Sequence, residues 1–284
     1  MNADYVNAAE AAQRRSEPDQ VPSRESEPRL KTAAEITRMR VAARRLASVL
    51  QTLARTVRPG LTTAELAVAA YASLTDADLH PVQRGYRGFP ADVAISVNEI
   101  AAHGVPGRRI LQTGDVVTVD LAVDYCGWKA DAAWTYSVGD GTPAGLRLLR
   151  AAYEATRAGI AAARAGARLG DIGVAVECAA QERGCRVVSS LCGHGIGRYL
   201  HEPPRVMQVS SPFNEKRIVP GMVLSIEPVV VLDMADVSVV RSADTHGLQT
   251  SDGRPCAQFE HTVAVFADHS EVLTVPVPVP RRRR

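Results

Sequence analysis

The sequence predicts an α+β fold in which an antiparallel or mixed sheet is covered on its outer face by helices. Two observations predict it: helical segments occur in two pairs, and several strand-like segments follow each pair. Helices that alternate singly with strands would instead indicate a doubly wound parallel sheet. A third observation is that the segments RPGLTTAEL and RAGARLGDI resemble each other. We infer an internal duplication, each half containing two helices and several strands.

The first pair of helices is predicted from capping residues and apolar spacing. Thr32 and Glu35 have the spacing of a capping box, and apolar residues follow at helical period. Arg58-Pro59-Gly60 ends this helix. Thr62 and Glu65 repeat the capping-box spacing and begin the second helix.

The second pair occupies residues 145–164 and the segment LGDIGVAVECAAQERG, with Gly166 between the helices and Gly184 at the end. Segments rich in β-branched residues follow both pairs and predict strands. These segments are VAISV (93–97), DVVTVDLAV (115–123), WTYSVG (134–139), MVLSIEPVVVL (222–232), VSVV (237–240) and FEHTVAVF (259–266).

Composition places one domain between two tails. Residues 1–30 are rich in Glu, Arg, Ser, Pro and Gln, and cannot bury enough apolar surface to offset the entropy of ordering. We therefore expect a disordered N-terminal extension over 1–30, a folded domain over 31–276 and a flexible basic tail over 277–284. The run Arg281–Arg284 is interpreted as a solvated end, and a transient electrostatic contact with ribosomal RNA is the alternative.

Charge and cysteine content exclude several classes of protein. The 33 Lys and Arg nearly balance the 31 Asp and Glu, which argues against a dedicated nucleic-acid binder. No apolar run approaches the ~18–20 residues of a membrane span. The N-terminus lacks the layout of a signal peptide, so we expect a cytoplasmic protein without membrane association. We also expect a monomer. Five cysteines without CxxC spacing indicate free thiols in a reducing compartment.

Three carboxylates lie inside segments that otherwise predict buried strands: Asp120 in VVTVDLAV, Glu227 in MVLSIEPVVV and Glu260 in AQFEHTVAVF. Acidic side chains are almost never fully buried unless they are paired. The free energy of burying an uncompensated carboxylate is large enough that the group would protonate. The flanking strands contain almost no Lys or Arg. Metal binding is therefore favoured over ion pairing.

Two more residues are candidate ligands. Asp131 follows Asp120 across YCGWK, which predicts a hairpin that brings both aspartates to one face of neighbouring strands. His194 lies between Gly193 and Gly195, where the backbone can approach closely. Four carboxylates would be neutralised by two divalent cations, and oxygen-rich ligation with one imidazole suits Mn, Fe, Co or Zn rather than a structural zinc site.

The sequence resembles the type I methionine aminopeptidases, within the wider pita-bread group of metallopeptidases. The resemblance extends from about Lys31 to Val275. It implies a pita-bread (creatinase/aminopeptidase-type) fold with pseudo-twofold duplicated halves and a curved, mostly antiparallel sheet covered by helix pairs. The segments that carry it are GYRGFPADVAISVNEIAAHGVP (85–106), TVDLAVDYCGWKADAA (118–133), CGHGIGRYLHEPP (192–204), PGMVLSIEP (220–228) and AQFEHT (257–262).

The resemblance implies removal of the initiator methionine from nascent polypeptides that have a small second residue. It implies that Asp120, Asp131, His194, Glu227 and Glu260 bind two divalent metal ions. Asp131 and Glu260 would bridge both ions, and Asp120 would be bidentate to one of them. The ions would activate a shared water, whose proton Glu227 would transfer.

The resemblance also implies roles around the metals. His103 would contact the methionine amine or the leaving group, and His201 would hydrogen-bond the scissile carbonyl or the oxyanion. Asn98 lies near the family's monovalent-cation site. The side chains expected in the methionine pocket are Tyr86, Phe89 and His246.

The chain departs from the family pattern at Ala94, Ala132, Leu200 and His246. None of these removes a ligand, but three of them, Ala94, Leu200 and His246, alter the expected methionine pocket. Two alternatives therefore stay open. One is a related enzyme of the same fold that cleaves Xaa-Pro bonds. The other is a binding relative without metal or catalysis.

Overall fold

The computed structural model describes residues 27–211, 215–242 and 247–276. Most of the expected N-terminal extension and the whole expected tail, with Arg281–Arg284, lie outside these ranges, as does His246. No helix in the described ranges is long and apolar enough to cross a membrane.

The helices of both predicted pairs are present, and the two predicted capping boxes are confirmed. The Thr32 side chain accepts a hydrogen bond from the Glu35 N–H, and the Glu35 side chain accepts one from the Thr32 N–H. Thr62 and Glu65 make the same reciprocal pair. The helices are α2 (Ala33–Leu53), α3 (Thr63–Asp76), α4 (Pro143–Ala162) and α5 (Leu169–Gln181).

The strands form four sheets, and every strand pairing among the described residues is antiparallel. The first sheet contains β1 (His80–Pro81), β2 (Ala94–Val97), β4 (Val116–Tyr125) and β5 (Trp128–Ser137). The largest has the order β15 (Ser270–Val272), β14 (His261–Val265), β9 (Val223–Ile226), β7 (Cys192–Gly195) and β8 (Glu202–Met207). The third sheet has the order β13 (Cys256–Gln258), β10 (Val229–Leu232) and β6 (Cys185–Val187). The fourth has the order β11 (Val239–Arg241), β12 (Leu248–Thr250) and β3 (Ile100–Ala102).

One predicted strand is wrong in its extent. The segment 222–232 forms two strands, β9 and β10, which belong to different sheets. The break falls at Glu227-Pro228, and a proline cannot donate a hydrogen bond to a sheet ladder. This break places Glu227 at the end of a strand rather than inside one.

The predicted duplication is visible in the backbone hydrogen bonds. The Gly60 N–H donates to the Leu111 carbonyl at 2.8 Å, and the Gly166 N–H donates to the Ile218 carbonyl at 2.9 Å. Both glycines have positive φ, near +85° and +87°, and each lies between the two helices of its pair. The two resembling segments therefore fold in the same way, one in each half of the chain.

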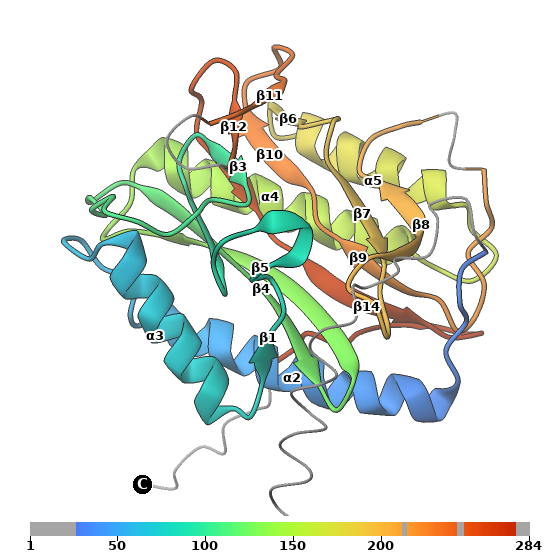
Figure 1. Cartoon of the computed structure of the whole chain (residues 1–284). Coiled ribbons are helices and arrows are strands. Elements are labelled where there is room, and N and C mark those ends of the chain that lie inside the picture. Colours follow the sequence, from blue (N-terminus) through green and yellow to red (C-terminus); the bar gives the residue numbers. More distant parts are fainter. Residues whose placement is uncertain (1–26, 212–214, 243–246, 277–284) are drawn as a thin grey trace, which may run out of the picture.

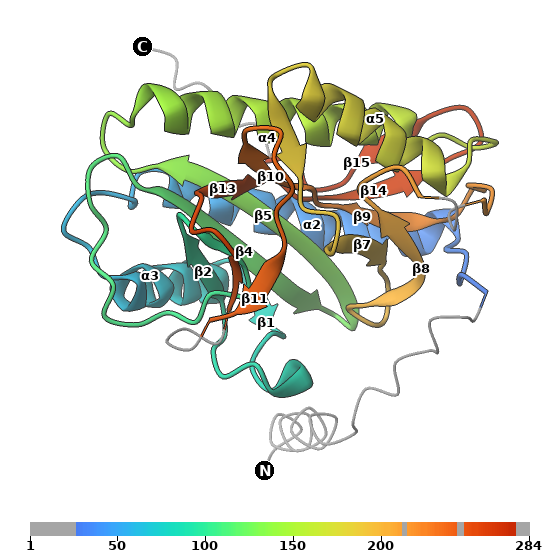
Figure 2. The same ribbon diagram turned by 90° about the horizontal axis from the view of Figure 1, so that it is seen from above.

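The two helix pairs lie against different parts of the strands: Figure 1 shows α2 and α3 below them and α4 and α5 behind them. Figures 1 and 2 show α4 and α5 behind the strands, with the short helix η1 (Tyr86–Gly88) on the opposite, front side. Helices α2 and α3 pack with β4 and β5 in one cluster of buried apolar residues. Helices α4 and α5 pack with β9, β10 and β14 in a second cluster. The first cluster also contains Ile196, Leu200, Val223, Ala264 and Leu273, so the two halves are packed against each other.

Candidate metal centre

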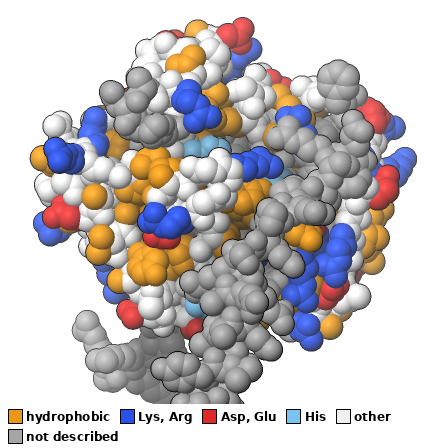
Figure 3. Space-filling view, viewed as in Figure 1, with side chains coloured by type: hydrophobic (Ala, Val, Ile, Leu, Met, Phe, Trp, Pro, Cys, Tyr) orange, Lys and Arg blue, Asp and Glu red, His pale blue; other side chains and the backbone are white. Residues whose placement is uncertain are grey.

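A cavity of ≈ 520 Å³ opens on the front face, and all five candidate ligands line it. Figure 3 shows histidine side chains in a hollow on this face, bordered by hydrophobic side chains. The cavity is also lined by His103 and His201, and by residues of η1. The structure therefore brings together residues that span more than half of the sequence.

Strand register explains how the two aspartates meet. Asp120 pairs with Ala133 and Asp131 pairs with Ala122, so the aspartates are diagonal neighbours on one face of the β4–β5 hairpin. The hairpin turn is Cys126-Gly127, where both residues have positive φ. The predicted hairpin geometry is confirmed.

The second half of the chain supplies the other three residues. His194 is on β7, Glu227 directly follows β9, and Glu260 directly precedes β14. The Glu260 N–H donates to the Ala133 carbonyl at 2.7 Å, and this bond joins the start of β14 to β5. Because Ala133 is the register partner of Asp120, Glu260 lies beside the aspartates.

Asp120 and Glu227 have equivalent places in the two halves. Their separation along the chain equals that of Leu111 and Ile218, which accept the repeated hydrogen bonds described above. Each follows a glycine with positive φ, Gly114 or Gly221, by the same number of residues. The duplicated fold thus directs one carboxylate from each half into the same cavity.

The atoms that could bind a metal are close together. The His194 Nε2 lies 3.4 Å from Glu227 Oε1 and 3.7 Å from Asp131 Oδ2. One ligand atom from each of Asp131, His194 and Glu260 lies within 4.8 Å of the others, and all three residues are buried. The His194 Nδ1 is 2.9 Å from the Gly195 carbonyl, which only accepts hydrogen bonds, so Nδ1 carries the proton. The Nε2 lone pair is therefore available to a metal.

Burial and mutual repulsion disfavour the charged forms of the four carboxylates. Burial raises the pKa of Asp120 to about 7, and burial with the neighbouring Asp120 raises the pKa of Glu260 to about 8. Burial and adjacent carboxylates raise the pKa values of Asp131 and Glu227 well above the ordinary range. Among the described residues, no Lys or Arg forms an ion pair with any of the four acids.

The donor set fits divalent metal ions. Asp131 Oδ1 is buried and has no hydrogen-bond partner among the described residues, so an acceptor is left unsatisfied beside the other acids. Carboxylate oxygens with one imidazole suit Mn, Fe, Co or Zn. Burial lowers the pKa of His194 to about 4, which keeps the imidazole neutral, as a ligand must be.

Gln83 and Ser225 hydrogen-bond the acids and hold them in place, and neither residue was predicted from the sequence. Gln83 Nε2 donates to Asp120 Oδ1 at 3.2 Å. The Ser225 hydroxyl lies 2.5 Å from Glu260 Oε1 and 3.0 Å from Glu227 Oε1. Ser225 precedes Glu227 by two residues, so strand alternation was a usable signal for it. Gln83 comes from a loop and gives no such signal.

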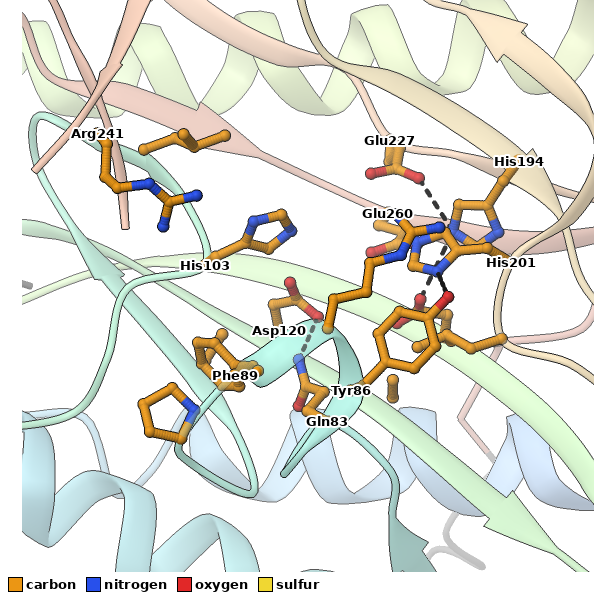
Figure 4. Close-up of a pocket in the computed structure, with 18 residues that line it drawn as sticks. Gln83, Tyr86, Phe89, His103, Asp120, His194, His201, Glu227, Arg241 and Glu260 are labelled. Carbon is orange, nitrogen blue, oxygen red and sulfur yellow. Dashed lines mark hydrogen bonds and ion pairs between the residues drawn. The ribbon is translucent and has the colours of Figure 1, made fainter. Parts of the chain in front are cut away.

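The two other histidines lie on opposite sides of the carboxylates (Figure 4). His201 Nδ1 is 2.6 Å from the Tyr86 hydroxyl, and its ring centroid is 4.2 Å from that of His194. His103 is exposed at the rim of the cavity. The atoms packed around it lower its pKa, and the charges of Arg241 and Arg87 lower it further. Both histidines face the space where a substrate would lie.

The expected methionine pocket is only partly within the described residues. Tyr86, Phe89, Ala94 and Leu200 line the cavity, whereas Ala132 does not. His246 lies outside the described residues, so its expected place in the pocket stays a prediction.

Asn98 does not line the cavity. Its carbonyl accepts hydrogen bonds from the Cys256 N–H at 2.9 Å and from the Cys256 thiol at 3.1 Å. Its side-chain amide donates to Asp115 and accepts from the Val116 N–H. All polar groups of the Asn98 side chain and its carbonyl have protein partners, so this geometry adds no support for the expected monovalent cation.

Comparisons with known proteins identify relatives of the whole domain. The model of metallopeptidase family M24 matches residues 37–267. The methionine aminopeptidase of Treponema pallidum is 39% identical over 254 residues, covering 89% of this chain and 98% of the relative. Methionine aminopeptidase 1 of Bacillus subtilis is 36% identical over 244 residues, covering 86% and 98%. The crystal structure of methionine aminopeptidase from Rickettsia prowazekii superimposes with a TM-score of 0.83 at 32% identity, covering 88% of this chain and 100% of that one.

Proposed function

Because the chain belongs to metallopeptidase family M24, we propose that it is a methionine aminopeptidase that removes the initiator methionine from nascent proteins. The fold is accordingly the pita-bread fold of that family. The observation that carries the proposal is the cluster of four carboxylates and one neutral histidine that lacks any Lys or Arg partner among the described residues. Such a cluster needs cations, and relatives of this family named methionine aminopeptidase match most of the chain.

Asp120, Asp131, His194, Glu227 and Glu260 would hold two divalent cations of the Co, Mn, Fe or Zn class. Bound there, such cations would polarise the scissile carbonyl and increase the acidity of water. Their number and identity are part of the proposal.

The side chains of the cavity would perform the remaining steps. Glu227 is half-buried at the cavity wall and would take a proton from the water that attacks the scissile carbonyl carbon, then pass it to the leaving amine as the C–N bond breaks. His201 would donate a hydrogen bond to the oxygen of the scissile carbonyl as negative charge develops there. His103, on the other side, would contact the methionine amine or the leaving group.

Substrate selection follows from two adjoining cavities. The first has apolar walls from Tyr86, Phe89 and Leu200 and would receive the methionine side chain. The second, of ≈ 270 Å³, shares His103, His201 and Glu227 with the first and would receive the residue after the scissile bond. The preference for a small second residue is part of the proposal and is tested by the assay below.

We further propose that the protein acts as a cytoplasmic monomer on nascent polypeptide N-termini, with at most a transient contact to the ribosome. Neither membrane nor specific nucleic acid is required. Of the alternatives, metal-free binding has less support because all five candidate ligand residues are present. Xaa-Pro cleavage has less support because the similar chains are named methionine aminopeptidase.

An anaerobic cleavage assay tests the proposal. The purified chain is loaded with Mn, Fe, Co or Zn in turn, and peptides Met-Xaa-Ser are scanned over the second residue. We expect release of methionine when Xaa is Ala, Gly or Ser, and little release when Xaa is large. Cleavage of Xaa-Pro peptides in preference to Met-Ala-Ser would favour the related enzyme instead.

A further inference from the structure

A buried ion pair lies behind the loop that carries His201. Lys31 Nζ is 2.7 Å from Glu202 Oε2, and the two side chains are only 1% and 2% exposed. The other carboxylate oxygen of Glu202 accepts the Tyr199 N–H at 3.1 Å. Glu202 therefore links the middle of the loop, at Tyr199, to a residue distant in sequence.

The backbone is shaped to admit this pair. A Cβ atom at Gly197 would lie 2.6 Å from Glu202 Oε1 and 2.6 Å from Lys31 Cε, so a side chain at this position would displace both partners. The Lys31 N–H donates to the Gly221 carbonyl at 2.7 Å, which fixes the segment preceding α2 beside the turn that leads into β9. The pair is thus built from three separate parts of the chain.

Stability alone does not explain the pair. Burial keeps the pKa of Lys31 below its ordinary value although Glu202 raises it, so the pair does not fully offset the cost of desolvation. Replacing a buried ion pair by uncharged groups of similar volume is commonly neutral or stabilising. A geometric role accounts for it better.

The loop connects two residues of the site. Residues 196–201 lie between β7, which carries His194, and β8, which begins at Glu202. The β7–β8 register is irregular between His194 and Gly195, and Glu202 is the partner of Gly195 just beyond that irregularity. His201 lines the cavity beside Tyr86, whereas Glu202 turns to Lys31. Glu202 is therefore placed to fix the direction of its neighbour.

We propose that Lys31 and Glu202 are positioning residues: their ion pair fixes the loop so that the His201 imidazole stands across from His194. The inference rests on the proposed function only for its kinetic readout. It assigns a role to the segment preceding α2, which does not contact the cavity.

The test removes both charges together. K31M/E202Q keeps an oxygen that can accept the Tyr199 N–H and leaves no unpaired charge. We expect it to fold and to bind metal as the wild type does, with kcat for Met-Ala-Ser lowered about 10- to 100-fold and KM little changed, because small displacements of a reacting group are costly. The matched control is R40M/E271Q, which removes an ion pair of 2.6 Å between α2 and β15, and its kcat should not change.

A double-mutant cycle distinguishes positioning from general destabilisation. In an H201A background, K31M/E202Q should lower kcat no further, because the pair acts through His201. Additive losses in kcat would overturn the proposal, as would wild-type kcat in K31M/E202Q. If K31M/E202Q does not fold, E202D keeps both charges and shortens the reach of the carboxylate; unchanged kcat in that variant would equally contradict it.

A readout without turnover keeps the inference separate from the proposed function. The imidazole ¹⁵N signals of His201 should shift in K31M/E202Q and stay in place in R40M/E271Q. Unchanged signals would overturn the positioning role even if the chain cleaves no methionine peptide. Failure of the wild type to release methionine would count only against the proposed function.

Discussion

The hydroxyl of Ser225 lies 2.5 Å from Oε1 of Glu260, within the core of the site. Ser225 is fully buried, so no water can replace this hydrogen bond. Residues that orient a metal ligand commonly contribute 10- to 100-fold to metal affinity. We therefore predict that S225A lowers metal affinity by about 10- to 100-fold, measured by isothermal titration under anaerobic conditions.

Thr118 provides the matched control for this variant. It has the place in β4 that Ser225 has in β9, but its hydroxyl bonds Thr135 at 2.8 Å rather than a candidate ligand. T118V should keep the wild-type metal affinity. Equal losses of affinity in S225A and T118V would show that the effect is general to the core.

Replacement of Glu260 by Gln should remove metal without changing the shape of the site. The amide cannot supply the negative charge of a carboxylate, and four acids around the cavity make that charge the main attraction for a divalent ion. We expect E260Q to retain less than one tenth of the wild-type activity and to bind less metal per chain by elemental analysis. E271Q, in a half-exposed ion pair with Arg40, serves as the control. Full metal content and activity in E260Q would contradict the assignment of this residue.

The stability of the metal-free chain should fall as pH rises from 6.5 to 8.5. A buried carboxyl with a raised pKa stabilises the fold below its unfolded pKa, and that contribution is lost as pH rises through the folded pKa, about 7 for Asp120 and about 8 for Glu260. His194 has a lowered pKa, so its contribution is lost only at lower pH, outside this window. When metal is bound, its positive charge would offset the free-energy cost of burying the ionised carboxylates.

Calorimetric unfolding with and without metal measures this effect. The Tm of the chelated protein should decrease across the window, and the gain in Tm on adding metal should increase. A gain that is the same at pH 6.5 and pH 8.5 would indicate that the buried carboxylates are not the metal ligands.

Loss of the Tyr86 hydroxyl should slow catalysis. The hydroxyl lies 2.6 Å from His201 Nδ1 and the two rings stack with centroids 5.1 Å apart, so the hydroxyl helps to hold the direction of the imidazole. A hydrogen bond of this kind contributes about 1 kcal/mol, so Y86F should lower kcat about fivefold. Steady-state kinetics on Met-Ala-Ser measure the change. A Y86F enzyme with wild-type kcat would mean that the Tyr86 hydroxyl is not needed to hold His201.

Much of the site could be predicted because buried acids conflict with their surroundings. Asp120, Glu227 and Glu260 each interrupt an apolar segment, and the hairpin between Asp120 and Asp131 follows from local turn geometry. The helix pairs were equally local, since capping boxes at Thr32 and Thr62 need only residues three positions away.

Other features depend on contacts between distant segments and have no local signal. The ion pair between Lys31 and Glu202 joins the segment preceding α2 to the start of β8, and Gln83 reaches Asp120 from a loop. The strands β3 and β12 are only three residues long, and they pair with each other although they are distant in the sequence. Alternation of apolar and polar residues over three positions is too short to predict a strand. The break at Pro228 does have a local signal, because proline cannot donate a hydrogen bond to a sheet ladder, although β-branched residues continue on both sides of it.

The most direct test of the central claim is metal-dependent release of free methionine from Met-Ala-Ser, followed by mass spectrometry for the wild type and E260Q. We expect no release by the chelated wild type, restored release after anaerobic addition of Mn, Fe, Co or Zn, and no such recovery in E260Q. Release that is unaffected by chelation, or absent with every one of these metals, would contradict it.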